Sequence, residues 1–148
     1  MEISFYQLTV QSLDIALPKL LSKVRLANMK VLVKVKSTED MNDLDLLLWT
    51  FDAESFLVHD TLKSKYQKDQ PIYITTGDEN PAFAEVLVLT AGTTSTSMEG
   101  YKRVLEIFDG TNSLAVDAAR ERWSKYKNDG HDISYFQQSE TGGWVKKG

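Results

Sequence analysis

One segment near the C-terminal end of the sequence combines cations with an aromatic ring at helical spacing. Its members are separated by four, three and four residues: Val116, Arg120, Trp123 and Lys127. This spacing aligns side chains along one face of a helix. An apolar floor beside a guanidinium group suits an acidic peptide that ends in a hydrophobic residue and a carboxylate. The alternative is a solvated helix face that carries one isolated tryptophan.

A second candidate site is a cluster of three aromatic residues within eight positions: Trp49, Phe51 and Phe56. We expect the cluster at a turn between a helix that ends at Trp49 and a short strand over residues 55–59. The rings could plug the core or form an exposed recognition surface. We favour the docking surface, because a turn flanked by a helix end cannot bury every ring.

Catalytic and metal-binding constellations are incomplete in this sequence. The two histidines are His59 and His131, and there is no cysteine. Ser55 lies four residues before His59, which does not match a nucleophile elbow. Two histidines without cysteine argue against a zinc site. We therefore expect no catalytic residue, no metal and no cofactor.

A nucleotide-binding enzyme is the alternative function. Residues 91–97, Ala-Gly-Thr-Thr-Ser-Thr-Ser, follow an apolar strand and precede a predicted helix, so this Gly92 loop could cradle a phosphate. The first predicted strand, in contrast, is followed by Thr-Val-Gln-Ser over residues 9–12. That segment lacks the glycines of the dinucleotide-binding fingerprint.

The hydrophobic periodicity predicts alternating strands and helices. We expect strands at 3–9, 31–35, 55–59, 71–75, 85–90 and 133–138, and helices at 13–26, 37–49, 101–110 and 113–127. The apolar residues of segments 31–35 and 85–90 are nearly continuous, which is typical of strands buried on both faces. This order predicts an α/β fold, a Rossmann-like three-layer sandwich with a mostly parallel sheet and helices on both faces.

The expected core face of the last helix lies beside the basic and aromatic face. It consists of small or apolar residues and one tyrosine: Leu114, Ala115, Ala118, Ala119 and Tyr126. We expect Arg122 and Lys125 to widen the basic margin of the face that carries Trp123.

Length and composition indicate one ordinary globular domain over residues 1–148. Hydrophobic residues make up 42% and charged residues 26% of the chain. The net charge of −4 argues against duplex nucleic acid as the main partner, because phosphate binding needs a basic face. No apolar run approaches the ~18–20 residues of a membrane helix, and no signal peptide is recognisable. The absence of cysteine excludes disulfides and fits a reducing cytoplasm.

Several motifs resemble those of a known family. These are Leu-Trp-Thr-Phe-x-x-x-Ser-Phe-x-x-His over residues 48–59, Ala-Arg-Glu-Arg-Trp-x-x-Tyr-Lys over residues 119–127, Gly-His at 130–131, Tyr-Phe-Gln-Gln at 135–138 and Gly-Gly-Trp at 142–144. In order and spacing they are similar to the chi subunit of bacterial DNA polymerase III, an accessory protein of the clamp-loader complex.

The resemblance implies a non-catalytic adaptor of the replisome in the bacterial cytoplasm. Chi pairs with the psi subunit of the clamp loader, and Trp49 and Phe56 match the psi-facing motif, with Phe51 between them. Chi also binds the acidic C-terminal tail of the single-stranded-DNA-binding protein, and Arg120 and Trp123 match the tail-binding helix. DNA would then be reached only indirectly, through these partners.

Overall fold

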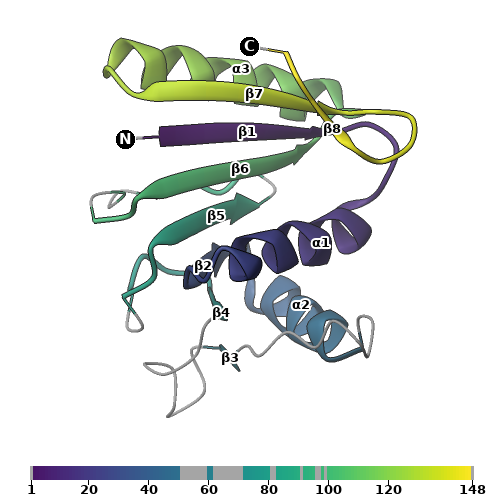
Figure 1. Cartoon of the computed structure of the whole chain (residues 1–148), viewed down its shortest axis with the longest axis vertical. Helices are drawn as coiled ribbons and strands as arrows, with labels where there is room; N and C mark the ends of the chain where they lie inside the picture. The colour runs from purple at the N-terminus through teal and green to yellow at the C-terminus, as the bar shows by residue number, and fades with distance from the viewer. Residues whose placement is uncertain are drawn as a thin grey trace.

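The computed structural model describes residues 2–50, 60–61, 72–80, 83–90, 92–95, 98 and 100–147. The elements, in chain order, are β1 (Glu2–Leu8), α1 (Leu13–Leu26), β2 (Val31–Lys34), α2 (Thr38–Thr50), β3 (Asp60–Thr61), β4 (Ile72–Thr75), β5 (Val86–Thr90), β6 (Arg103–Asp109), α3 (Ser113–Asn128), β7 (Asp132–Gln138) and β8 (Trp144–Lys146). They form an α/β sandwich around one sheet (Figure 1), which confirms the predicted fold class.

The described strands form one eight-stranded sheet in the order β3-β4-β2-β5-β6-β1-β7-β8. Each neighbouring pair is parallel except β7 and β8, which are antiparallel. Strand β1 lies between β6 and β7, and its residue Phe5 is in register with Glu106 on one side and Tyr135 on the other. The parallel arrangement brings the carboxyl ends of β1, β2, β5 and β6 to the same edge of the sheet.

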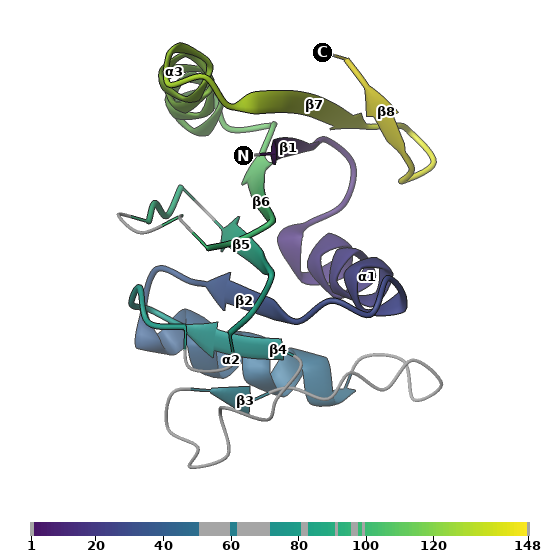
Figure 2. The ribbon, with the colours of Figure 1, turned by 60° about the vertical axis from the view of Figure 1, so that its left-hand side comes forward.

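Alternate side chains of the strands supply two separate apolar cores. On β6, Leu105 and Ile107 pack with α1 and α2. Val104 and Phe108, on the opposite face of the same strand, pack with α3. Figure 2 shows α3 and α1 on opposite sides of the sheet. The side chains of β2 and β5 are therefore buried on both faces, as the nearly continuous apolar segments predict: α1 and α2 cover one face, and α3 together with the connecting segments at Ala84 and Tyr101 forms the core on the other.

The prediction of a helix over residues 101–110 is wrong, because this segment contains strand β6 at the centre of the sheet. Its side chains from Val104 to Phe108 are all buried. Burial of five consecutive side chains is what a strand covered on both faces produces. Gly110, expected to end a helix, instead lies against β1, where its N–H donates to the carbonyl oxygen of Leu8 at 2.7 Å. A Cβ at this position would clash with that oxygen.

Side-chain hydrogen bonds mark the starts of α2 and α3. The hydroxyl of Ser37 accepts a hydrogen bond from the N–H of Asp40 at 3.1 Å. Asn112 caps α3, since its side-chain oxygen accepts from the N–H of Ala115 at 3.1 Å. Such caps satisfy N–H groups that have no partner within the helix.

Two segments complete the comparison of predicted and observed strands, residues 144–146 and residues 55–59. Strand β8, over Trp144–Lys146, was not predicted and adds an antiparallel edge to the sheet. The strand expected over residues 55–59 lies outside the described residues.

In the part of the chain that the structure describes, no helix combines the length and the apolar character that crossing a membrane requires.

Candidate functional site

The site predicted on the last helix is carried by α3, which packs on β6 and β7. Asn112 fixes the start of the helix, and Lys125 and Lys127 lie in its last turn, where cations interact favourably with the negative end of the helix dipole. Because α3 is parallel to one face of the sheet, it has a flank toward β7 and a flank toward β6. The two flanks carry different chemistry.

The flank toward β7 carries the four residues that the sequence places on one face, which we call the Arg120 ridge: Val116, Arg120, Trp123 and Lys127. Val116 and Trp123 are half-buried and pack against the core on this side of the sheet. The ring of Trp123 lies edge-on to Tyr135, with the ring centroids 5.7 Å apart. The ridge therefore has a fixed apolar floor.

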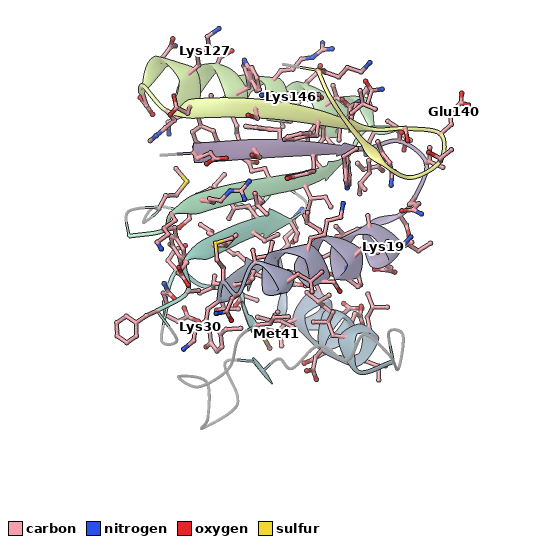
Figure 3. All side chains as sticks on the ribbon, viewed as in Figure 1. Lys19, Lys30, Met41, Lys127, Glu140 and Lys146 are labelled. Atoms are coloured by element: carbon pink, nitrogen blue, oxygen red, sulfur yellow. The ribbon has the colours of Figure 1, made fainter. Side chains whose placement is uncertain are left out.

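The cations of the Arg120 ridge remain accessible. Arg120 and Lys127 are both exposed, and Figure 3 shows Lys127 projecting from the end of α3. Burial raises the pKa of the Tyr135 hydroxyl, and the positive charge of Arg120 partly offsets this rise. The charge of Arg120 therefore acts at the Tyr135 ring, beside the apolar floor. An exposed guanidinium over a half-buried aromatic floor can pair with a carboxylate whose neighbour is apolar.

Two polar residues of this site were missed by the sequence analysis. Tyr135 borders Trp123, and its hydroxyl donates a hydrogen bond to the side-chain oxygen of Gln7. Gln7 and Tyr135 are 128 positions apart in the sequence. Only the parallel pairing of β1 with β7 brings them together, and no local pattern in the sequence gives that register.

The flank toward β6 contains a buried ion pair. The Nε atom of Arg122 donates to a carboxylate oxygen of Glu106 at 2.5 Å, and the Glu106 side chain is 2% exposed. Burial raises the pKa of Glu106, while the charge and hydrogen bond of Arg122 act in the opposite direction. Burial and the neighbouring Glu106 also raise the pKa of Tyr126. The guanidinium of Arg122 is therefore paired with a buried carboxylate. The expectation that Arg122 widens the basic margin beside Trp123 is wrong.

The expected core face of α3 is only partly correct. Ala119 and Tyr126 are buried, but Leu114 is 78% exposed. Trp123, which we placed on the basic and aromatic face beside this core face, contacts Phe5 at 5.7 Å between ring centroids. The large indole ring buries more apolar surface than Leu114 would, so the helix is turned with Trp123 toward the sheet.

The family model of the DNA polymerase III chi subunit, HolC, matches residues 1–134. The chain belongs to the DNA polymerase III chi subunit family. A curated protein of Rickettsia prowazekii (strain Madrid E), "Probable DNA polymerase III subunit chi", is 24% identical over 150 residues, which cover 98% of this chain and 91% of the relative.

Membership of the chi family confirms the resemblance and assigns the chain to DNA replication. The family is an accessory subunit of the polymerase III holoenzyme, not its catalytic subunit. The expectation of a non-catalytic replication protein is therefore confirmed at the level of the family. The matched region includes the whole of α3, and with it the Arg120 ridge.

The structure does not favour a dinucleotide in this chi-family chain, because a side chain occupies the place of the phosphate. Three consecutive N–H groups after β1, those of Thr9, Val10 and Gln11, donate to the side-chain oxygen of Gln138 at 3.3, 3.1 and 2.9 Å. In dinucleotide-binding folds the loop after the first strand supplies such amides to the pyrophosphate. Here the chain's own glutamine satisfies them.

The Gly92 loop also differs from the predicted phosphate cradle. Among the residues that the structure describes, the next element after this loop is strand β6 and not a helix, so they supply no helix N-terminus to bind a phosphate there. The carbonyl oxygen of Thr94 accepts a hydrogen bond from Lys34 Nζ at 2.6 Å. Lys34 is further engaged by Asp78, also at 2.6 Å.

The remaining candidates lie at the limits of the described residues. The backbone of Trp49 is in the last turn of α2, but the structure does not describe its side chain. The described residues include none of Phe51, Phe56 and His59. His131 contacts the ring of Tyr126, with centroids 6.1 Å apart. Among the described residues, no group of three or more histidine and carboxylate side chains could hold a metal ion.

Proposed function

We propose that this chi-family chain is a replisome adaptor with two protein-binding faces. One face binds the psi subunit of the clamp loader, and the other binds the C-terminal tail of the single-stranded-DNA-binding protein. The observation that carries the proposal is the Arg120 ridge, an exposed guanidinium beside a half-buried aromatic floor in a family of accessory replication subunits. The chain acts as a single domain in the cytoplasm and reaches DNA through its partners.

The chemistry of the Arg120 ridge suits the end of an acidic tail. Arg120 pairs with the terminal carboxylate, and the last apolar side chain lies against Trp123 and Val116. Lys125 and Lys127, in the last helical turn, attract the other acidic residues of the tail. The long-range charges contribute mainly to the association rate and its salt dependence, whereas the close Arg–carboxylate contact contributes most of the specificity.

Substitution of Arg120 tests the tail-binding face. We expect Arg120→Ala to weaken binding of a tail peptide by at least ~30-fold, about 2 kcal/mol, because the terminal carboxylate loses its guanidinium partner. Lys127→Ala should weaken binding only at low salt, since its charge is exposed and screened. Calorimetric titration of the peptide into each variant, at two salt concentrations, gives both results.

Two controls make the Arg120 result specific. A peptide that lacks its final residue should bind the parent chain as weakly as the full peptide binds Arg120→Ala. Lys19→Ala removes an exposed cation from α1, on the other side of the sheet, and should leave the affinity unchanged. Parent-like binding by Arg120→Ala, or no effect of shortening the peptide, would show that the ridge is not the tail site.

The psi-binding face is proposed at Trp49, Phe51 and Phe56. We expect Phe56→Ala to weaken the complex with psi by ~2 kcal/mol, about 30-fold, because aromatic anchors dominate interface energetics. The free chain should keep its melting temperature. Titration with purified psi and a thermal melt of the free variant are the two measurements. If the variant unfolds instead, the ring belongs to the core and the docking hypothesis fails for this residue.

A further inference from the structure

A cleft of about 770 Å³ lies at the edge of the sheet where the carboxyl ends of β1 and β6 meet the first turns of α1 and α3. Lys36, which follows β2, and Gly92, which follows β5, also line it. The volume is within the range of small-molecule sites. From this edge, β1 leads into α1 on one face of the sheet and β6 leads into α3 on the other. Such switch points are where open α/β sheets bind ligands.

The cleft is separate from the Arg120 ridge. Ala115, Ala118 and Arg122 line the cleft, and at 100° per residue they occupy the flank of α3 opposite Val116 and Arg120. The buried residues Ala119 and Tyr126 lie between the two flanks. A ligand in the cleft can therefore bind without contacting the tail-binding residues.

The walls of the cleft expose aliphatic side chains to solvent. Val10 on one side is 55% exposed and Leu114 on the other is 78% exposed, while Leu13 contributes a partly buried wall. Isolated exposed aliphatic residues are common, but here they border one concave surface. An apolar group in the cleft would remove these side chains from water.

The polar groups of the cleft favour a single negative charge. Lys36 supplies an exposed cation. Arg122, whose side chain is 14% exposed, is held in place by Glu106, which neutralises most of its charge. The carboxylate of Asp109 accepts hydrogen bonds from the N–H and the hydroxyl of Thr111, which lower the pKa of Asp109. The negative charge of Asp109 limits the negative charge that a ligand in the cleft can carry.

A large polyphosphate is not the expected ligand. The amides of residues 9–11, which border the cleft, already donate to Gln138. We propose that the cleft binds a small organic monoanion, with an apolar body between Val10 and Leu114 and its single negative group toward Lys36. The site is additional to the two protein-binding faces.

Fluorescence of 1-anilinonaphthalene-8-sulfonate, an aromatic monoanion, tests the proposal on the full-length chain. We expect saturable binding at one site per chain. Leu114→Asp and Lys36→Glu should each weaken it at least 10-fold, and because both side chains are exposed these variants should melt like the parent. The matched control Lys19→Glu makes the same charge change at an exposed position of α1 that lines neither the cleft nor the Arg120 ridge, and should bind the probe normally.

Competition identifies the preferred anion and separates this proposal from the adaptor function. Displacement of the probe by octanoate indicates a carboxylate, and displacement by adenosine monophosphate indicates a phosphate. Arg120→Ala should leave probe binding unchanged even where it abolishes tail binding. Unaltered probe binding by both cleft variants would overturn the proposal, and so would displacement of the probe by the tail peptide, which would assign the cleft to the tail.

Discussion

We expect Arg122→Ala to lower the free energy of unfolding by about 3–5 kcal/mol at neutral pH, because it leaves the Glu106 carboxylate buried without its cation. The side chain of Glu106 is 2% exposed, and besides Arg122 only the hydroxyl of the buried Tyr126 interacts with its carboxylate among the described residues. Urea unfolding of the parent and the variant at pH 7 measures the difference.

The loss in Arg122→Ala should depend on pH with a definite sign. Burial already raises the pKa of Glu106 above the ordinary 4.5, and removal of Arg122 raises it further. A carboxyl group with a raised folded-state pKa contributes its full stability below the unfolded pKa and loses that contribution as the pH rises. The deficit should therefore be smallest below about pH 4.5 and grow as the pH rises to neutrality.

A matched control separates this effect from a general loss of helix. Lys125→Ala removes an exposed cation from the same helix and should cost less than ~1 kcal/mol at either pH. An equal cost for Arg122→Ala at pH 4 and pH 7 would mean that the buried Glu106 charge is not the cause.

Local patterns in the sequence predicted most of the fold. The strands at 31–34 and 86–90 are short apolar runs, and Ser37 and Asn112 mark the starts of α2 and α3 with local hydrogen bonds. Strand β6 was missed because Val104, Leu105 and Phe108 also fit a helical spacing. A strand buried on both faces has no alternation of polar and apolar residues, so periodicity cannot distinguish it from a buried helix.

The candidate site was predictable only within α3. The four residues of the Arg120 ridge share one helix, and helical spacing alone aligns them. Tyr135 and Gln7 meet through the pairing of β1 with β7, and Arg122 meets Glu106 through the packing of α3 on β6. These are contacts between distant segments. The sequence therefore predicted the cations of α3 but not which of them is neutralised by a buried acid.

The same limit applies to Gln138, which the sequence presented only as part of a family motif. Its side chain is 4% exposed and accepts from three amides of the β1–α1 loop, while its own NH₂ group donates to Gln11 at 3.0 Å. The loop that starts α1, and one wall of the cleft, are thus held by a residue of β7.

We expect Gln138→Ala to lower the free energy of unfolding by about 3 kcal/mol, because three amides lose one shared acceptor at ~1 kcal/mol each. Hydrogen exchange of the Thr9, Val10 and Gln11 amides should accelerate more than that of the β1 amides, since the opening is local. Gln138→Glu retains the acceptor oxygen and should preserve most of the protection. Gln137→Ala, at the neighbouring half-buried position on the other face of β7, should leave these amides unchanged. Equal protection in Gln138→Ala and the parent would mean that other groups hold the loop.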